Sequence, residues 1–397
     1  MDLSFGDNYE DFRRQTCEFL DKNRDRAPAA GMGAGDITDL SRGWQTRLIE
    51  HGYAARTIPE EYGGFGGEPD PLIDIIIDEE FRRAGVAGPM MNQGISMLVP
   101  TLLEYGNEEH KRSYIGPTIR GEMIWCQGYS EPGAGSDLAG LRTSAVVDGD
   151  DFVVNGQKIW TSTAREAAMM FALVRTEPDT SKHAGISYLL LSMDSKGLEV
   201  RPLKTMTGAS SFNEVFFDDV RVPRTNLVGA RGQGWEIGTA TLVFERNMLG
   251  STSQTETIFK NLVAVAEDFG VLSDAGFRQR LVELQARVLA MKYHSLRLLT
   301  DKLQKRASGA AGLVTKLNGC QLNHDICALA IDAMEESGVF AKHSKGARDN
   351  GEWQAQYMFS LGMIIGGGTA QIQKNIIAER GLGMPREPRA AVSGGES

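Results

Sequence analysis

The stretch Ala145-Val146-Val147-Asp148-Gly149-Asp150-Asp151-Phe152-Val153-Val154-Asn155-Gly156 decides the fold class of this chain. Its two hairpin-turn dipeptides, Asp148-Gly149 and Asn155-Gly156, follow short runs rich in valine and phenylalanine, which is the pattern of strands joined by tight turns. Further β-rich runs occupy residues 169–174, 186–191, 198–203 and 215–222. About six short strands with turn signals between them predict a small antiparallel barrel or sandwich.

Residues on both sides of this β-rich zone predict helices. On the N-terminal side Asp7 is a candidate helix cap, and Asp70-Pro71 places an N-cap acid before a proline at the first helical position. On the C-terminal side apolar residues recur at helical spacing over 277–306. The predicted fold class is α+β and mainly helical. It comprises an N-terminal helical domain (1–120), a central small antiparallel β-barrel or sandwich domain (121–230) and a C-terminal helical bundle (231–397).

Composition excludes several classes of protein. The 397 residues include 42 Lys+Arg and 52 Asp+Glu, a net charge of −10, whereas a nucleic-acid binder carries a basic excess. The chain has no run of about 18 apolar residues and no signal-peptide pattern at its start. Its four cysteines form no CxxC pair. We therefore expect a cytoplasmic protein with no membrane span and no nucleic-acid partner.

Several weak motifs carry no prediction. The glycine runs at 31–35 and 133–135 do not complete the dinucleotide-binding pattern G-x-G-x-x-G, because Asp36 and Leu138 occupy the third glycine position. The six histidines show no metal-ligand spacing, so no metal site is expected. No G-x-S-x-G nucleophile elbow is present.

The segment Gln127-Gly128-Tyr129-Ser130-Glu131-Pro132-Gly133-Ala134-Gly135-Ser136-Asp137-Leu138 predicts a loop that suits an anionic or polar cofactor. Its glycines permit close backbone approach, and its serines offer hydroxyls beside free N–H groups. An ordinary glycine-rich connection is the alternative, and the loop alone leaves both open. Trp160, Thr161 and Ser162 follow at a strand end, where a tryptophan is more often core than cofactor platform.

Four motifs, taken together and in this order, resemble those of the acyl-CoA dehydrogenase family: residues 130–137, 155–160, 215–223 and 368–373, followed by 376–380. The resemblance covers nearly the whole chain and implies a flavoprotein with helical, β and helical domains. It implies FAD as cofactor, held by Gln127, Ser130, Gly135, Ser136, Trp160, Thr161, Ser162, Thr369 and Gln371. The family's Arg-x-x-Phe-Gly motif, which sends an arginine to a neighbouring subunit's FAD, is not recognised between Phe259 and Arg306.

The resemblance also indicates the catalytic base. Many family members place a glutamate at the position of Gly367, which has no side chain here, while isovaleryl-type members carry the base on the first long helix after the β domain. Glu245 stands at that place, in Phe244-Glu245-Arg246. The resemblance implies that Glu245 takes the α-proton of an acyl-CoA while the β-hydride passes to flavin N5, which gives a trans-2-enoyl-CoA. A solvated helix charge is the alternative for Glu245.

The resemblance implies partners as well: an acyl-CoA substrate, an electron-transfer flavoprotein or similar acceptor, and a homo- or hetero-oligomer, dimer or tetramer, in fatty acid or lipid catabolism. Two alternatives keep the fold. One is an acyl-CoA oxidase or flavin monooxygenase, and the other is a non-catalytic partner subunit of a hetero-oligomeric dehydrogenase.

Overall fold

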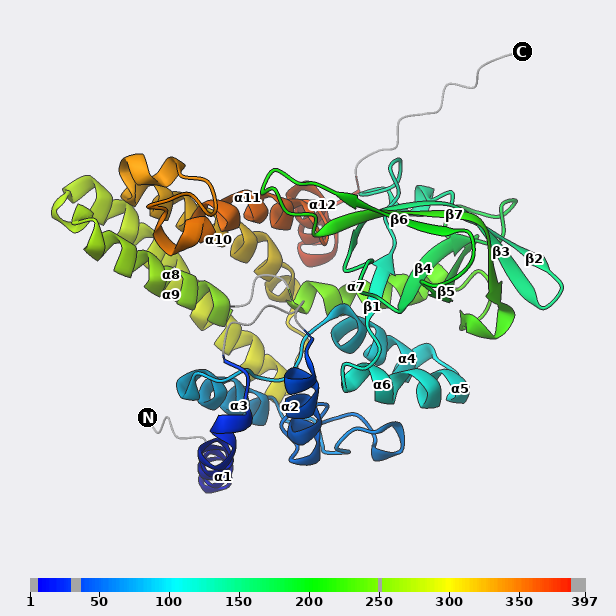
Figure 1. Cartoon of the computed structure of the whole chain (residues 1–397), viewed down its shortest axis with the longest axis horizontal. Helices are drawn as coiled ribbons and strands as arrows, with labels where there is room; N and C mark the ends of the chain where they lie inside the picture. Colours follow the sequence, from blue (N-terminus) through cyan, green and yellow to red (C-terminus); the bar gives the residue numbers. More distant parts are fainter. Residues whose placement is uncertain (1–5, 30–36, 249–251, 387–397) are drawn as a thin grey trace, which may run out of the picture. The chain divides into compact units, whose positions relative to one another are not determined.

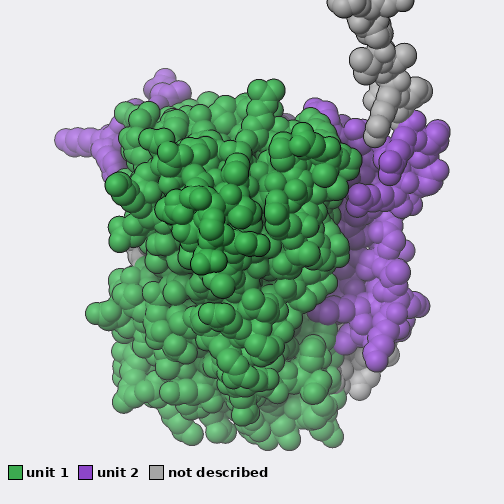
Figure 2. Space-filling model, turned by 90° about the vertical axis from the view of Figure 1, so that its right-hand side faces the viewer, with its two compact units in different colours: residues 1–245 green, residues 246–397 purple. Residues whose placement is uncertain are grey.

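The structure is a computed structural model that describes residues 6–29, 37–248 and 252–386; the side chains of residues 245–248 and 253 lie outside the description. The glycine run at 31–35 lies outside the described residues. The chain divides into two compact units, Met1–Glu245 and Arg246–Ser397 (Figure 2). Each is described by itself, and the predicted domain boundaries at 120 and 230 remain predictions.

Short helices form the N-terminal part of the first unit (Figure 1). They are α1 (Asp7–Asn23), α2 (Asp39–Glu50), α3 (Pro71–Ala84), α4 (Val99–Tyr105), α5 (Glu108–His110) and α6 (Gly116–Ile119). The start of α3 is as predicted, since the Asp70 side chain accepts a hydrogen bond from the Leu72 N–H at 3.0 Å and Pro71 is the first helical residue. Asp7 does not cap α1: it is the first helical residue, and Gly6 holds the cap position.

An eight-stranded sheet follows, in the order β6-β7-β3-β2-β4-β5-β8, with β1 paired to β4. Its strands are β1 (Trp125–Gly128), β2 (Ser144–Asp148), β3 (Asp151–Ser162), β4 (Met169–Arg175), β5 (Ile186–Ser192), β6 (Leu198–Leu203), β7 (Phe212–Pro223) and β8 (Leu227–Val228). The pairs are antiparallel apart from β1 with β4 and one residue pair between β2 and β4. Gln127 and Gly128, predicted as loop, belong to β1.

The long strand β3 contains a bulge where it pairs with β7. Lys158 lies opposite Val215, but the next paired residue, Thr161, lies opposite Asn213. Over this interval β3 therefore contains one residue more than β7 does. Trp160, inside the bulge, has a φ of 61°. The bulge therefore determines where the side chains of residues 158–162 point.

Helix α7 (Gly234–Met248) packs on this sheet within the first unit (Figure 1). A Cβ on Gly238 would lie 3.0 Å from Leu173 of β4, so glycine permits the close approach of helix and strand. The Thr241 hydroxyl lies 2.9 Å from the hydroxyl of Thr101 on α4. The same helix is thus bound to both the sheet and the N-terminal helices, and Glu245 lies in its last turn.

The second unit is helical. Its helices are α8 (Thr252–Asp268), α9 (Ala275–Leu303), α10 (Thr315–Ala333), α11 (Glu352–Ile365) and α12 (Ala370–Ile376). Leu262, Val288, Ile326 and Trp353 are among the residues of its core. Together with the first unit, these helices confirm the mainly helical α+β fold class. Within the described ranges, none of the helices has the length and apolar character needed to cross a bilayer.

Candidate functional site

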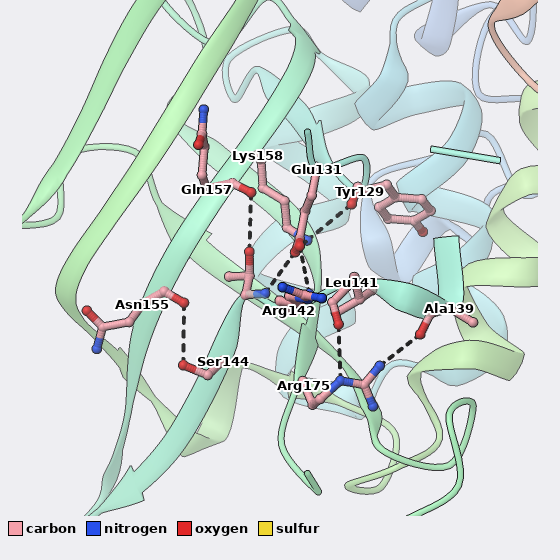
Figure 3. A network of polar contacts seen from close by, with 11 residues as sticks. Tyr129, Glu131, Ala139, Leu141, Arg142, Ser144, Asn155, Gln157, Lys158 and Arg175 are labelled. Atoms are coloured by element: carbon pink, nitrogen blue, oxygen red, sulfur yellow. Dashed lines mark hydrogen bonds and ion pairs between the residues drawn. The ribbon is translucent and has the colours of Figure 1, made fainter. Parts of the chain in front are cut away.

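A buried ion pair holds the glycine-rich loop, residues 129–142, against β3 (Figure 3). The fully buried Lys158 ammonium donates to Glu131 Oε1 at 2.8 Å and to the Tyr129 carbonyl at 3.1 Å. The Glu131 carboxylate in turn accepts from the backbone N–H groups of Arg142 at 2.6 Å and Thr143 at 2.8 Å. One ion pair therefore binds both ends of the loop.

Burial acts on both charges of this pair. Burial alone would raise the pKa of Glu131, but the attraction of Lys158 and the hydrogen bonds from Lys158, Thr143 and Arg142 hold that pKa below its ordinary 4.5. Burial lowers the pKa of Lys158 to about 8, with the Glu131 charge opposing the shift. The hydrogen bonds and the mutual attraction of the two charges therefore offset part of the cost of burying them.

Two further contacts fix the loop. The Arg175 guanidinium donates to the Ala139 carbonyl at 2.8 Å and to the Leu141 carbonyl at 3.1 Å, as Figure 3 shows. The Ile159 N–H donates to the Ser130 carbonyl at 2.9 Å, which brings the start of the loop beside the bulged part of β3. The predicted loop residues and residues 160–162 are thereby gathered in one region of the first unit.

The tip of the loop is open. A Cβ built on Gly133 or Gly135 meets no described atom within 4 Å, and neither glycine has a positive φ. Ser136 is exposed beside them. Nothing within the described chain requires glycine at 133 or 135, and the absence of side chains there leaves room for the close approach of a bound molecule.

Residues 160–162, at the bulge, alternate in exposure: Trp160 is exposed, Thr161 is buried and Ser162 is half-buried. The Trp160 side chain is 58% exposed and meets the Phe212 ring edge-on, at 6.1 Å between centroids. The alternative that Trp160 is a core residue is therefore wrong. Thr161 is buried, and its hydroxyl has no hydrogen-bond partner among the described residues.

These residues fit a flavin. The buried amide nitrogen of Gln127 and the buried hydroxyl of Thr161 both lack a partner in the described part of the chain, whereas buried polar atoms are normally hydrogen-bonded. The edge of a flavin ring carries the nitrogen and oxygen atoms that such groups bind, and an exposed indole offers an apolar face for the ring. The open tip at Gly135 and Ser136 suits phosphate oxygens.

The remaining predicted residues lie elsewhere. Thr369 caps α12 through a hydrogen bond that its hydroxyl accepts from the Ile372 N–H at 3.3 Å, and Gln371 is exposed on the same helix. Both belong to the second unit, so their placement beside the loop remains a prediction. Glu245 lies in α7, and its side chain is outside the described residues.

Half of one family motif was overlooked in the sequence. Phe269-Gly270, directly after α8, can supply the Phe-Gly of Arg-x-x-Phe-Gly. The arginine position is then Ala266, which is fully buried in the helical core. The signal was the Phe-Gly dipeptide, and the substitution means that this chain does not supply the arginine at that position.

The order of helices, sheet and helices, with a loop whose residues fit a flavin, is that of a flavoprotein. The chain belongs to the acyl-CoA dehydrogenase family: the models of the family's N-terminal, middle and C-terminal domains match residues 6–122, 126–220 and 232–382. It is therefore an FAD-dependent acyl-CoA dehydrogenase, as predicted, and FAD is its cofactor.

Individual relatives cover the same span. The chain is 38% identical over 389 residues to the acyl-CoA dehydrogenase IpdE1 of Mycobacterium tuberculosis, covering 96% of this chain and 99% of the relative. The solved steroid ACAD Tcur3481-Tcur3483 is 30% identical, with a TM-score of 0.81 over 98% of this chain and 100% of its own. The ChsE4-ChsE5 complex from Mycobacterium tuberculosis is 30% identical, with a TM-score of 0.78 and the same coverage.

Proposed function

We propose that this enzyme removes the α-proton and the β-hydride of an acyl-CoA thioester to give a trans-2-enoyl-CoA, with Glu245 as the base. The observation that carries the flavin half of this proposal is the pair of partnerless buried groups, on Gln127 and Thr161, in the same region as the exposed Trp160. Bound FAD supplies the two-electron acceptor.

Two groups of the chain would take part: Glu245 would accept the α-proton, and the Gly367 N–H would bind the thioester carbonyl oxygen. Glu245 accepts the proton from the α-carbon, which is acidic only when the thioester carbonyl is polarised. The Gly367 N–H is the donor proposed for that carbonyl oxygen. Gly367 carries no side chain that could act as base, which supports the assignment of that task to α7.

We propose a bulky acyl group, branched or ring-bearing, as the substrate. Gly367 leaves free the volume that a glutamate side chain fills in many family members, and the similar Tcur3481-Tcur3483 structure is described as a steroid ACAD. Highest kcat/KM on a straight medium-length acyl-CoA, with ring-bearing acyl-CoAs rejected, would contradict this part of the proposal.

We also propose that the active form is a hetero-oligomer that passes its electrons to an electron-transfer flavoprotein or similar acceptor. The similar ChsE4-ChsE5 structure is a complex of two named proteins. Ala266 at the arginine position of the Phe-Gly motif supports a partner that supplies the missing cation.

Single-turnover flavin reduction in Glu245→Gln tests the base. The amide keeps the shape but accepts no proton, so reduction by the acyl-CoA that works best on the parent should slow by about 10²–10⁴. Glu236→Gln, which removes an exposed carboxylate from the same helix, is the matched control and should reduce at the parent rate. A Glu245→Gln rate within threefold of the parent would remove Glu245 from the mechanism. Rapid re-oxidation by air would instead favour the oxidase alternative.

A further inference from the structure

The turn between α11 and α12, residues 366–368, has a backbone shape that only glycine adopts readily. Gly367 and Gly368 have φ values of 61° and 96°, and a Cβ on Gly368 would lie 2.6 Å from the Gln373 side-chain nitrogen. Such a turn is flexible when it is free, so its fixed shape must come from the contacts around it.

Two buried side chains supply those contacts. The Lys316 ammonium, near the start of α10, donates to the Ile364 carbonyl at 3.0 Å and to the Gly368 carbonyl at 2.7 Å. The Gln373 amide donates to the Gly367 carbonyl at 3.1 Å. Only 4% of Lys316 and 2% of Gln373 are exposed. The end of α11 and the last two residues of the turn are therefore held by side chains shielded from water.

Lys316 binds one carbonyl on each side of the peptide group that carries the Gly367 N–H, and the two adjoining peptide groups are hydrogen-bonded as well. The peptide group that carries this N–H is preceded by one whose Gly366 N–H donates to the Gly362 carbonyl at 2.7 Å, and it is followed by the one whose Gly367 carbonyl binds Gln373. A peptide group between two hydrogen-bonded neighbours has little freedom to rotate. Burial of an ammonium is costly, and its charge-assisted hydrogen bonds are stronger and more directional than those of a neutral donor.

We propose that Lys316 is a positioning residue, which holds the turn 366–368 in the conformation from which the Gly367 N–H donates to the thioester carbonyl. This inference rests on the proposed function, because it assigns Lys316 a part in that polarisation. It concerns contacts within the second unit alone, all of them between described residues.

Hydrogen exchange of the full chain measures the first consequence. Lys316→Met keeps the apolar stem and removes the donor, so the Gly366 amide, which donates to the Gly362 carbonyl, should exchange at least about tenfold faster than in the parent. Lys260→Met, an exposed lysine on α8, is the control and should leave that exchange unchanged. Unchanged exchange of the turn in Lys316→Met would overturn the proposal.

Flavin reduction measures the second consequence. A donor that loses its alignment should slow single-turnover reduction by about 10- to 100-fold, while the FAD dissociation constant and the KM for the acyl-CoA change less than threefold. Faster turn exchange together with a reduction rate within twofold of the parent would also overturn the proposal, since Lys316 would then be merely structural.

Gln373→Met is the second variant, for the case in which Lys316→Met does not fold. If Lys316→Met does not fold, Gln373→Met removes the neighbouring contact and should show the same exchange and rate pattern, and its absence would overturn the proposal. If the parent is reduced by no acyl-CoA, the proposed function fails instead, and the exchange of the turn alone then decides whether Lys316 holds it.

Discussion

The two glycine-rich segments of this enzyme, the loop tip 133–135 and the turn 366–368, use glycine for opposite reasons. At Gly133 and Gly135 the backbone is ordinary and the space beside each residue is open. At Gly367 and Gly368 the backbone is left-handed, and a side chain on Gly368 would collide with Gln373. Glycine at the second segment therefore serves the fold itself, whereas at the first segment the backbone does not require it, and we propose that it leaves space for the cofactor.

A buried lysine holds each segment, but the chemistry differs. Lys158 binds a carboxylate, Glu131, which carries the hydrogen bonds on to the loop's far end. Lys316 donates directly to two carbonyl oxygens, that of Ile364 in α11 and that of Gly368 at the end of the turn. Loss of Lys158 would leave a buried negative charge, whereas loss of Lys316 would leave buried carbonyls, which cost less to leave unpaired. The comparison predicts how far each change should lower stability.

The largest expected effect is that of Lys158→Met. The variant leaves Glu131 buried without its cation and should lower the free energy of unfolding by about 3–5 kcal/mol. Chemical denaturation followed by circular dichroism measures this loss, and Lys196→Met, an exposed lysine between β5 and β6, should change it by less than about 0.5 kcal/mol. A loss below about 1 kcal/mol would show that the pair does not hold the loop.

Next in size is Gly368→Ala. An alanine at a φ of 96° is strained, and its Cβ would displace the Gln373 amide, so the variant should lose about 1–3 kcal/mol of stability. The same denaturation experiment measures it. An unchanged free energy of unfolding would mean that the backbone does not require glycine at 368, and the contrast between the two glycine-rich segments would be wrong.

Local signals in the sequence predicted much of this fold and less of the site. Most strands and the start of α3 were predicted because valine-rich runs and Asp70-Pro71 act on their immediate neighbours. The turn predicted at Asn155-Gly156 was wrong, since both residues lie inside β3 and pair with neighbouring strands. Gln127 and Gly128, the last two residues of β1, were taken for loop, since the pairing of β1 with β4 is distant in sequence. The exposure of Trp160 depends on a bulge opposite β7. The contacts of Lys158 and Lys316 join residues 27 to 52 positions apart, and no local pattern reveals them.

Acid should cause a smaller loss of stability, through protonation of Glu131. The pKa of Glu131 is lower in the folded chain than its ordinary 4.5, so the unfolded chain binds more protons between these two values, and the stability that Glu131 contributes is lost as the pH falls through that window. Glu131→Gln should therefore be less stable than the parent at neutral pH, and the difference should shrink below 4.5. Denaturation of both proteins across that range measures the change. A difference that stays constant with pH would mean that the charge of Glu131 does not hold the loop.

The smallest stability effect, and the sharpest test of the comparison, is that of Gly135→Ala. The added methyl group meets no chain atom and restricts only the unfolded chain, so stability should rise by about 0.4–1 kcal/mol or stay level. FAD, however, should bind about tenfold or more weakly, because the methyl group occupies the space that we assign to the cofactor. Gly43→Ala, at an open position in α2, is the control: it should stabilise by a similar amount and leave FAD binding unchanged. Titration of FAD into the apoenzyme, followed by flavin fluorescence, separates the two variants. If Gly135→Ala binds FAD as tightly as Gly43→Ala does, no cofactor approaches the loop tip, and the open glycines of the first segment have lost the reason that distinguishes them from the second.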